Sequence, residues 1–158
     1  MREDDVKEQL SALFEENSSG FVKDFEAMSH ELLAKEHGGV SRCAYDFVYE
    51  VALFNRRVAA RLRSEDPGKW PFESFPIAPG EMKEKAAMGK LLRESVEQIT
   101  RDLAALPSER LSEKVPVAGQ PMDFGQLIVF CVSHMIYHDG QLNYIQAMAG
   151  DNEMHWDA

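Results

Sequence analysis

The sequence has few cysteines and no long apolar run. The first feature argues against a disulfide-rich protein and the second against a membrane-spanning one. Among 158 residues the two cysteines, Cys43 and Cys131, stand alone, and neither belongs to a Cys-x-x-Cys motif. We therefore expect reduced, buried thiols and no disulfide framework. No apolar stretch approaches the ~20 residues that a membrane-spanning helix needs. Residues 1–5 are polar and lack the apolar segment of a signal peptide, so we expect a cytoplasmic protein without a membrane partner.

Basic residues are scarce as well. The chain has 17 Lys and Arg residues against 27 Asp and Glu, a formal net charge of −10. A surface of that sign repels the phosphates of a nucleic acid, so no nucleic-acid partner is expected. The densest basic cluster is interpreted as a solvated helix face, and it comprises Arg56, Arg57, Arg61 and Arg63.

Helical periodicity occupies most of the chain. Apolar residues recur every three, four or seven positions in four stretches, residues 4–28, 41–63, 81–106 and 123–149. Ser41 and Asp123 are the expected N-caps of two of them. With 44% hydrophobic and 28% charged residues, the chain fits a single domain over residues 1–158. The predicted fold class is all-α, a four-helix bundle.

The segments between the predicted helices are expected to be turns and loops. Polar residues 17–20 predict a kink or a break in the first stretch, and residues 29–31 predict a turn. His30 and His37, in this polar region, are expected to be solvated. Residues 64–80 contain four prolines and cannot form a continuous helix, and residues 106–122 are predicted to be a second loop. Three aromatic residues in the first of these loops are expected to pack over the bundle, namely Trp70, Phe72 and Phe75.

The most informative pattern is a pair of histidines in the last helical stretch. His134 and His138 are four residues apart, so on a helix their side chains lie one above the other and can share one metal ion. An apolar stripe on both sides predicts that they point into the bundle, and it comprises Leu127, Phe130, Cys131, Leu142, Ile145 and Met148. Two core histidines that are hydrogen-bonded by carbonyls or carboxylates would give the same pattern, so both interpretations stay open here.

The run HMIYHDGQLNYIQAMAGDNEMHW resembles the last helix of the DinB/YfiT-like superfamily of metalloenzymes. The pattern usual in that family is a His, three residues, a second His and then Arg-Gly-Gln. Gly140 and Gln141 match it, whereas Asp139 stands where the Arg is common. The resemblance implies an up-down-down-up bundle. The first proline-rich loop permits this topology, because it can reach about 50 Å whereas a helix of ~24 residues is about 36 Å long.

The resemblance also implies a third metal ligand, usually a His in the second helix a few residues before an Asn. Five residues before Asn55 the sequence has Glu50, and the second helical stretch contains no His. Glu50, His134 and His138 would form a set of two imidazoles and one carboxylate for one divalent metal, Zn, Ni, Mn or Fe. Two alternatives remain, an ordinary exposed Glu50 paired with Arg57 or a neighbour, and a ligand one turn earlier at Asp46.

The function that the resemblance implies is metal-assisted thiol transfer, or a related hydrolysis, on a small substrate. The partner would be a low-molecular-weight thiol, and the family implies a homodimer, with the aromatic loop as a candidate contact. Gln141 would flank the pocket, and Tyr49 and Tyr137 are candidate proton donors or simple packing residues. Because Glu50 replaces the usual His, a non-catalytic bundle that binds a small molecule, with or without metal, is the alternative.

Overall fold

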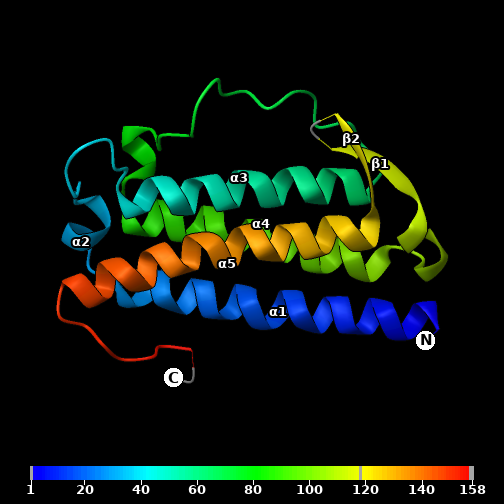
Figure 1. The fold of residues 1–158 in the computed structure, drawn as a ribbon, viewed down its shortest axis with the longest axis horizontal. Helices are drawn as coiled ribbons and strands as arrows, with labels where there is room; N and C mark the ends of the chain where they lie inside the picture. The colour runs from blue at the N-terminus through cyan, green and yellow to red at the C-terminus, as the bar shows by residue number, and fades with distance from the viewer. Residues whose placement is uncertain (1, 118, 157–158) are drawn as a thin grey trace.

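A computed structural model describes residues 2–117 and 119–156 of the chain (Figure 1). The five α-helices are α1 (Glu3–Ala27), α2 (His30–Ala34), α3 (Ala44–Leu62), α4 (Lys85–Ala105) and α5 (Phe124–Met148). Two short 3₁₀ helices are η1 (Gly80–Met82) and η2 (Ser108–Ser112), and the two strands are β1 (Lys114–Val117) and β2 (Gln120–Asp123). No described helix is long and apolar enough to cross a membrane.

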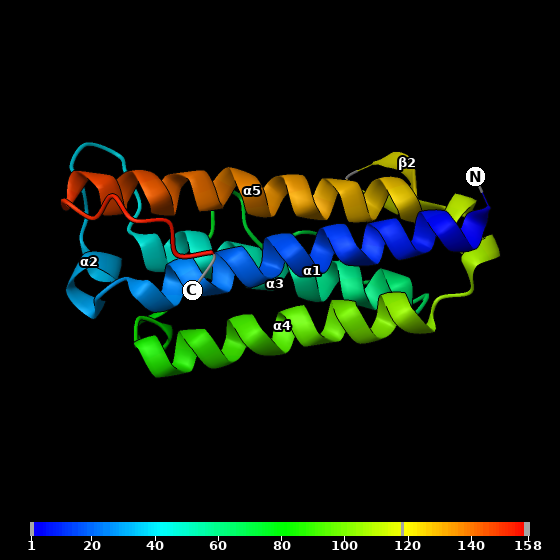
Figure 2. The same ribbon diagram turned by 90° about the horizontal axis from the view of Figure 1, so that it is seen from below.

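The four long helices lie side by side as a bundle (Figures 1 and 2). Helix α3 packs against α4 and α5, and α1 packs against α5 and α4. The colour gradient shows that α3 and α4 run in the same direction, while α1 and α5 run in the opposite one. The all-α bundle predicted from the sequence is confirmed, and a long crossover joins the two parallel helices.

Helix α1 shows why these residues fold as they do. Leu10, Phe14, Phe21 and Phe25 are buried and recur at four, seven and four residues, so they form one inward stripe. The break predicted as one alternative at residues 17–20 is wrong, because α1 is continuous from Glu3 to Ala27. Within that stretch, a methyl group added at Gly20 would come within 3.3 Å of the Trp156 ring, so this glycine makes room for the C-terminal tail.

Two helix starts differ from expectation. A short helix, α2, stands where the turn at residues 29–31 was predicted, because the Ser29 hydroxyl caps it by accepting the backbone N–H of Leu32. Helix α3 begins after Cys43 rather than after Ser41, since the Asp46 carboxylate accepts the backbone N–H of Cys43. Asp123 caps α5 as predicted.

The loop predicted for residues 106–122 is wrong in part. It contains η2 and an antiparallel hairpin in which Lys114 pairs with Asp123 and Pro116 with Pro121. Prolines argue against strands because they cannot donate a ladder hydrogen bond. Two prolines directly opposite each other nevertheless fit an antiparallel pair, where alternate positions exchange no hydrogen bonds.

The crossover between α3 and α4 contacts the bundle through arginines, whereas two of the three aromatic residues expected to pack there are exposed, Trp70 by 36% and Phe75 by 69%. The Arg57 guanidinium donates to the carbonyl oxygens of Pro67 (3.0 Å) and Gly68 (2.5 Å) and lies 5.5 Å from the centre of the Trp70 ring. Further along, the Arg42 guanidinium lies 4.7 Å from the centre of the Phe75 ring. Arginines from the bundle region therefore position this segment above α3.

Candidate metal centre

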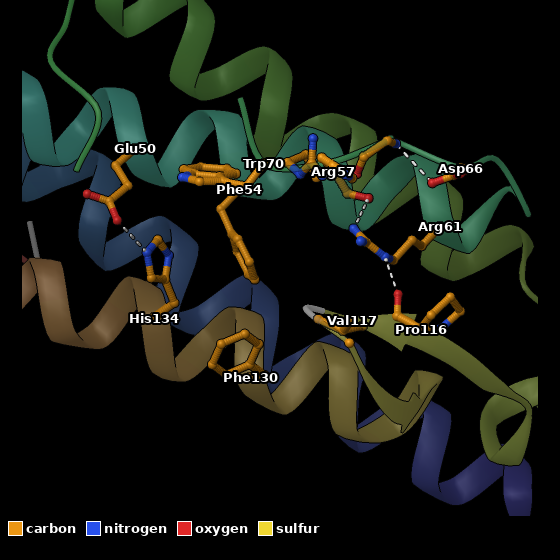
Figure 3. Close-up of a pocket in the computed structure, with 13 residues that line it drawn as sticks. Glu50, Phe54, Arg57, Arg61, Asp66, Trp70, Pro116, Val117, Phe130 and His134 are labelled. Atoms are coloured by element: carbon orange, nitrogen blue, oxygen red, sulfur yellow. Dashed lines mark hydrogen bonds and ion pairs between the residues drawn. The ribbon is translucent and has the colours of Figure 1, made fainter. Parts of the chain in front are cut away.

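Three side chains predicted as ligands meet between α3 and α5. Each of Glu50, His134 and His138 offers one ligand atom, and these atoms lie within 4.8 Å of one another. The Nε2 atoms of His134 and His138 lie 3.5 and 3.7 Å from the same Glu50 oxygen, Oε1. Figure 3 shows Glu50 reaching across from α3 to His134. Donors from two helices thus converge on one point.

Helix α5 turns the histidines inward because of the apolar residues around them. Leu127, Cys131 and Leu142 are fully buried, as the predicted stripe requires. The stripe is wrong for Phe130 and Met148, which are 43% and 51% exposed. His138 itself is 1% exposed, whereas the His134 side chain keeps 18% exposure, so the cluster opens to solvent on the His134 side.

Gln141 fixes the orientation of the His138 ring. The Gln141 oxygen Oε1 lies 2.7 Å from His138 Nδ1 and, as an acceptor, takes its N–H. The ring therefore directs Nε2 at Glu50, and His134 directs its own Nε2 at the same carboxylate oxygen. Two imidazole nitrogens and a carboxylate oxygen aimed at one point can bind a divalent ion in place of the protons between them, so these residues fit a divalent metal.

Aromatic rings hold the two imidazoles in place. The Phe47 ring stacks on His138 with centroids 5.6 Å apart, and the Phe54 ring lies 4.6 Å from His134. The two imidazoles themselves meet edge to face at 4.7 Å. Packing of this kind limits ring rotation, so the ligand atoms are preorganised.

Glu50 is paired with Arg42 and not with Arg57. Arg42 Nη1 lies 2.5 Å from Glu50 Oε2, and both side chains are nearly buried. The same nitrogen donates to the Pro76 carbonyl at 3.1 Å, which fixes the guanidinium. Burial raises the pKa of Glu50, but hydrogen bonds from the two histidines and from Arg42 outweigh it and lower the pKa below its usual range. The carboxylate is therefore charged at neutral pH, with Oε1 directed at the histidines.

The remaining predicted site residues lie elsewhere. Asp46 is buried but accepts the backbone N–H groups of Cys43 and Ala78 and pairs with Lys83 at 3.4 Å, so it fixes the start of α3. Tyr49 lines a separate hollow between α3 and α4. Tyr137 is 64% exposed and touches His138 only edge to face, at 5.1 Å. The structure does not bring any of these three into the ligand cluster.

Sequence reasoning missed Arg42 and Phe54. Arg42 falls in the second predicted helical stretch, but it is eight residues before Glu50 and precedes α3 in the structure, so helical spacing does not mark it as the partner of Glu50. Phe54 could have been found, because it is four residues after Glu50 and so shares its face of α3.

An open cavity of about 690 Å³ extends from the cluster along α3 (Figure 3). Glu50 and His134 line one end of it. Its other lining residues come from α3, the crossover, the hairpin and α5, and they are Phe54, Arg57, Arg61, Asp66, Gly68, Lys69, Trp70, Pro116, Val117, Gly119 and Phe130. The centre is therefore accessible to a small molecule.

A second buried acidic cluster lies between α1 and α5, next to the histidines in sequence. Asp24 is fully buried and accepts hydrogen bonds from Asn143 Nδ2 (2.9 Å) and from Trp156 Nε1 (2.6 Å). Burial, together with the charge of Asp24 and a hydrogen bond to it, raises the pKa of Asp139 to about 8. Asp139 therefore keeps its proton at neutral pH, beside Asp24.

The fold and the three convergent side chains define a helical-bundle protein with a candidate metal site of two histidines and one carboxylate. The chain belongs to the DinB superfamily, whose family model matches residues 24–142. No curated protein matches the sequence. A crystal structure of a conserved protein from Enterococcus faecalis has the same fold, with a TM-score of 0.68 and 13% identity over 90% of this chain and 96% of that one.

Proposed function

We propose that this protein is a divalent-metal-dependent enzyme that acts on a small molecule, by thiol transfer or by a related hydrolysis. The observation that carries the proposal is the convergence of Glu50, His134 and His138 at one end of an open cavity. A metal ion bound there would supply Lewis acidity and lower the pKa of a bound water or thiol.

The protein's own residues have separate tasks in this proposal. Glu50 supplies the negative charge that two neutral imidazoles lack, and Gln141 holds the His138 tautomer in which Nε2 is free. Phe47 packs on the His138 ring, and Phe54 packs on the His134 ring where it also lines the cavity. The partial exposure of His134 leaves a path by which a substrate can approach from the cavity.

A non-catalytic bundle is the second candidate, and one observation favours it. The Arg42 guanidinium already neutralises Glu50, so the carboxylate is satisfied without a metal ion. In that case the cavity would bind a small molecule without transforming it.

Metal content separates the two candidates first. Protein made without a His tag, stripped with a chelator and incubated with Zn, Ni or Mn salts, should bind close to one ion per chain by elemental analysis. His138→Ala and His134→Ala should lose this ion. His30→Ala is the matched control, because His30 bonds Tyr45 outside the cluster. A wild-type protein that stays metal-free with all three salts would refute the proposal.

Activity is the second measurement. The metal-loaded protein should accelerate the conjugation of cysteine or glutathione to an electrophilic fluorophore, or the hydrolysis of an activated ester, and the His138→Ala variant should not. Metal binding without either activity would favour the non-catalytic bundle. The homodimer also stays a prediction, and light scattering at micromolar concentration would contradict it by giving a monomer mass.

A further inference from the structure

The cavity at the metal centre continues along α3 to a group of positive charges. Glu50, Phe54, Arg57 and Arg61 all line it and follow at intervals of four, three and four residues, so they form one stripe of the helix. At 1.5 Å per residue, Arg57 is about 10 Å and Arg61 about 16 Å beyond Glu50 along the helix axis. Figure 3 shows this order, with Glu50 and His134 at one end and both arginines at the other.

The far end of the cavity carries excess positive charge. Its charged lining residues are Arg57, Arg61 and Lys69 against the single carboxylate Asp66, so the local balance is 3 − 1 = +2 in a chain of net charge −10. Within residues 2–117 and 119–156, neither Arg57 nor Arg61 forms an ion pair; their guanidinium groups donate to carbonyl oxygens. A carbonyl satisfies a hydrogen bond but does not neutralise a charge.

Other arginines of the basic cluster behave differently. Arg56, next to Arg57 but on the α4 side, pairs with Glu94, and Arg63 pairs with Asp102 and Glu65. The cluster is therefore not one solvated face, because two of its members point into the cavity. Burial and the charge of Arg57 lower the pKa of Arg61, and the charge of Asp66 offsets this only in part, so an anion bound beside Arg61 would offset it further.

The middle of the cavity is apolar and aromatic. The Phe54 and Phe130 rings meet edge to face at 5.4 Å between the metal centre and the arginines. Phe130 is 43% exposed although it lies on a bundle helix, and Trp70 is 36% exposed. Exposed aromatic surface of this kind, continuous with a cavity, is typical of a ligand site.

We propose that the cavity binds an elongated small anion. Its carboxylate, sulfonate or phosphate group meets Arg57 and Arg61, its apolar middle lies against Phe54 and Phe130, and its reactive end reaches the metal centre. Only the last of these three contacts rests on the proposed function. The substrate class is thus a molecule with an acidic group about 10–16 Å from the atom that reacts.

The test uses a matched pair of fluorescent probes on metal-free protein. The anion 8-anilinonaphthalene-1-sulfonate and the neutral N-phenyl-1-naphthylamine share an aromatic body and differ by the sulfonate. Wild-type protein should bind the sulfonate more tightly, and added salt should weaken only that probe. The double variant Arg57→Gln/Arg61→Gln should bind the sulfonate at least tenfold more weakly while its affinity for the neutral probe changes less than twofold.

Three further variants separate recognition of the anionic group from a general loss of binding. Arg56→Gln, the matched control on the same helix, should bind both probes as wild type does. Arg57→Lys/Arg61→Lys should restore most of the affinity for the sulfonate, because the charge is kept although the fork geometry is lost. Phe54→Ala should weaken both probes. If the double Gln variant weakens both probes equally, or if Arg56→Gln has the same effect, the cavity does not recognise the anionic group and the proposal is wrong.

Metal binding, measured on the same variants, distinguishes a failure of the anionic subsite from a failure of the proposed metal-dependent function. His138→Ala should abolish metal binding and leave the affinity for the sulfonate unchanged. Metal binding without selectivity for the anion would overturn the anionic subsite alone. Selectivity without metal binding would overturn the proposed function and leave the subsite intact.

Discussion

Helix α5 packs against two buried carboxylates, Glu50 of α3 and Asp24 of α1. The charge of a buried carboxylate is balanced differently at the two places. His138 faces α3 and Glu50, whereas its neighbour Asp139 faces α1 and Asp24. Glu50 has a guanidinium beside it and stays charged. Among the described residues, the side-chain donors to Asp24 are neutral, and burial next to Asp24 lets Asp139 keep its proton. A buried carboxylate can stay ready for a metal ion only where a cation balances it.

Asp139 stands where the family pattern usually has an Arg. In this chain the position carries a second acid next to Asp24. The C-terminal tail compensates in part, since the Trp156 indole donates to Asp24 and packs on Gly20. This side of α5 therefore has a structural task, and the α3 side has the candidate chemistry.

The largest expected effect is on the metal side. Glu50→Gln should weaken metal affinity by more than the 10–100-fold typical of groups outside the ligand sphere, because it removes a charged ligand. Glu50→His should retain binding, since it restores the ligand usual in the family. Asp46→Asn is the control and should bind metal as wild type does. Titration calorimetry on chelator-stripped protein measures all three, and a Glu50→Gln affinity equal to wild type would place the site elsewhere.

The proton that Asp139 keeps beside Asp24 predicts a pH dependence of the free energy of unfolding. The pKa of Asp139 in the folded protein, about 8, lies above its value in the unfolded chain. Between the two values the folded state holds a proton that the unfolded state releases, so metal-free protein loses stability as the pH rises. Asp139→Asn should remove this slope, a difference on the order of 2 kcal/mol between about pH 5 and about pH 8 once partial exposure is allowed for.

Urea unfolding of both proteins across that pH range measures the effect. Metal binding by Asp139→Asn should equal that of wild type, because the substitution is on the other side of α5. A slope that persists in the variant would show that Asp139 is not the group that keeps the proton.

Removing Arg42, the counter-ion of Glu50, tests whether a cation keeps this buried carboxylate charged. Arg42→Gln should destabilise the metal-free protein by about 1–2 kcal/mol, because Glu50 is left buried with weaker partners. The same change should raise metal affinity severalfold, since a positive guanidinium no longer opposes the ion. Arg56→Gln breaks an exposed pair with Glu94 and should change stability by less than about 0.5 kcal/mol. If both variants cost the same, the Arg42 pair has no special role.

The smallest expected effect is a loss of stability on changing Trp156 in the C-terminal tail. Trp156→Phe keeps much of the packing on Gly20 but removes the hydrogen bond to Asp24, so it should cost about 1 kcal/mol of stability. Thermal unfolding with and without metal measures it. The loss should be the same in both states, and a loss seen only in the metal-bound protein would tie the tail to the metal centre.

Much of the bundle could be predicted because helical periodicity is a local signal. The four long helices appear where apolar residues recur at three or four positions, and Asp123 caps α5 as its sequence position indicates. Short elements were missed. Helix α2 and the hairpin with Pro116 opposite Pro121 have too few residues for a periodic pattern, and neighbouring segments stabilise them.

For the candidate site, the sequence was enough to identify His134 and His138 as possible metal ligands on one helix face. Spacing along one helix is enough for that, because a turn has a constant number of residues. Only the tertiary structure decided that Glu50 and not Asp46 faces them, that Arg42 balances it, and that Arg57 and Arg61 point into the cavity while Arg56 does not. These contacts join segments far apart in sequence, and their geometry depends on how the helices rotate and pack against each other.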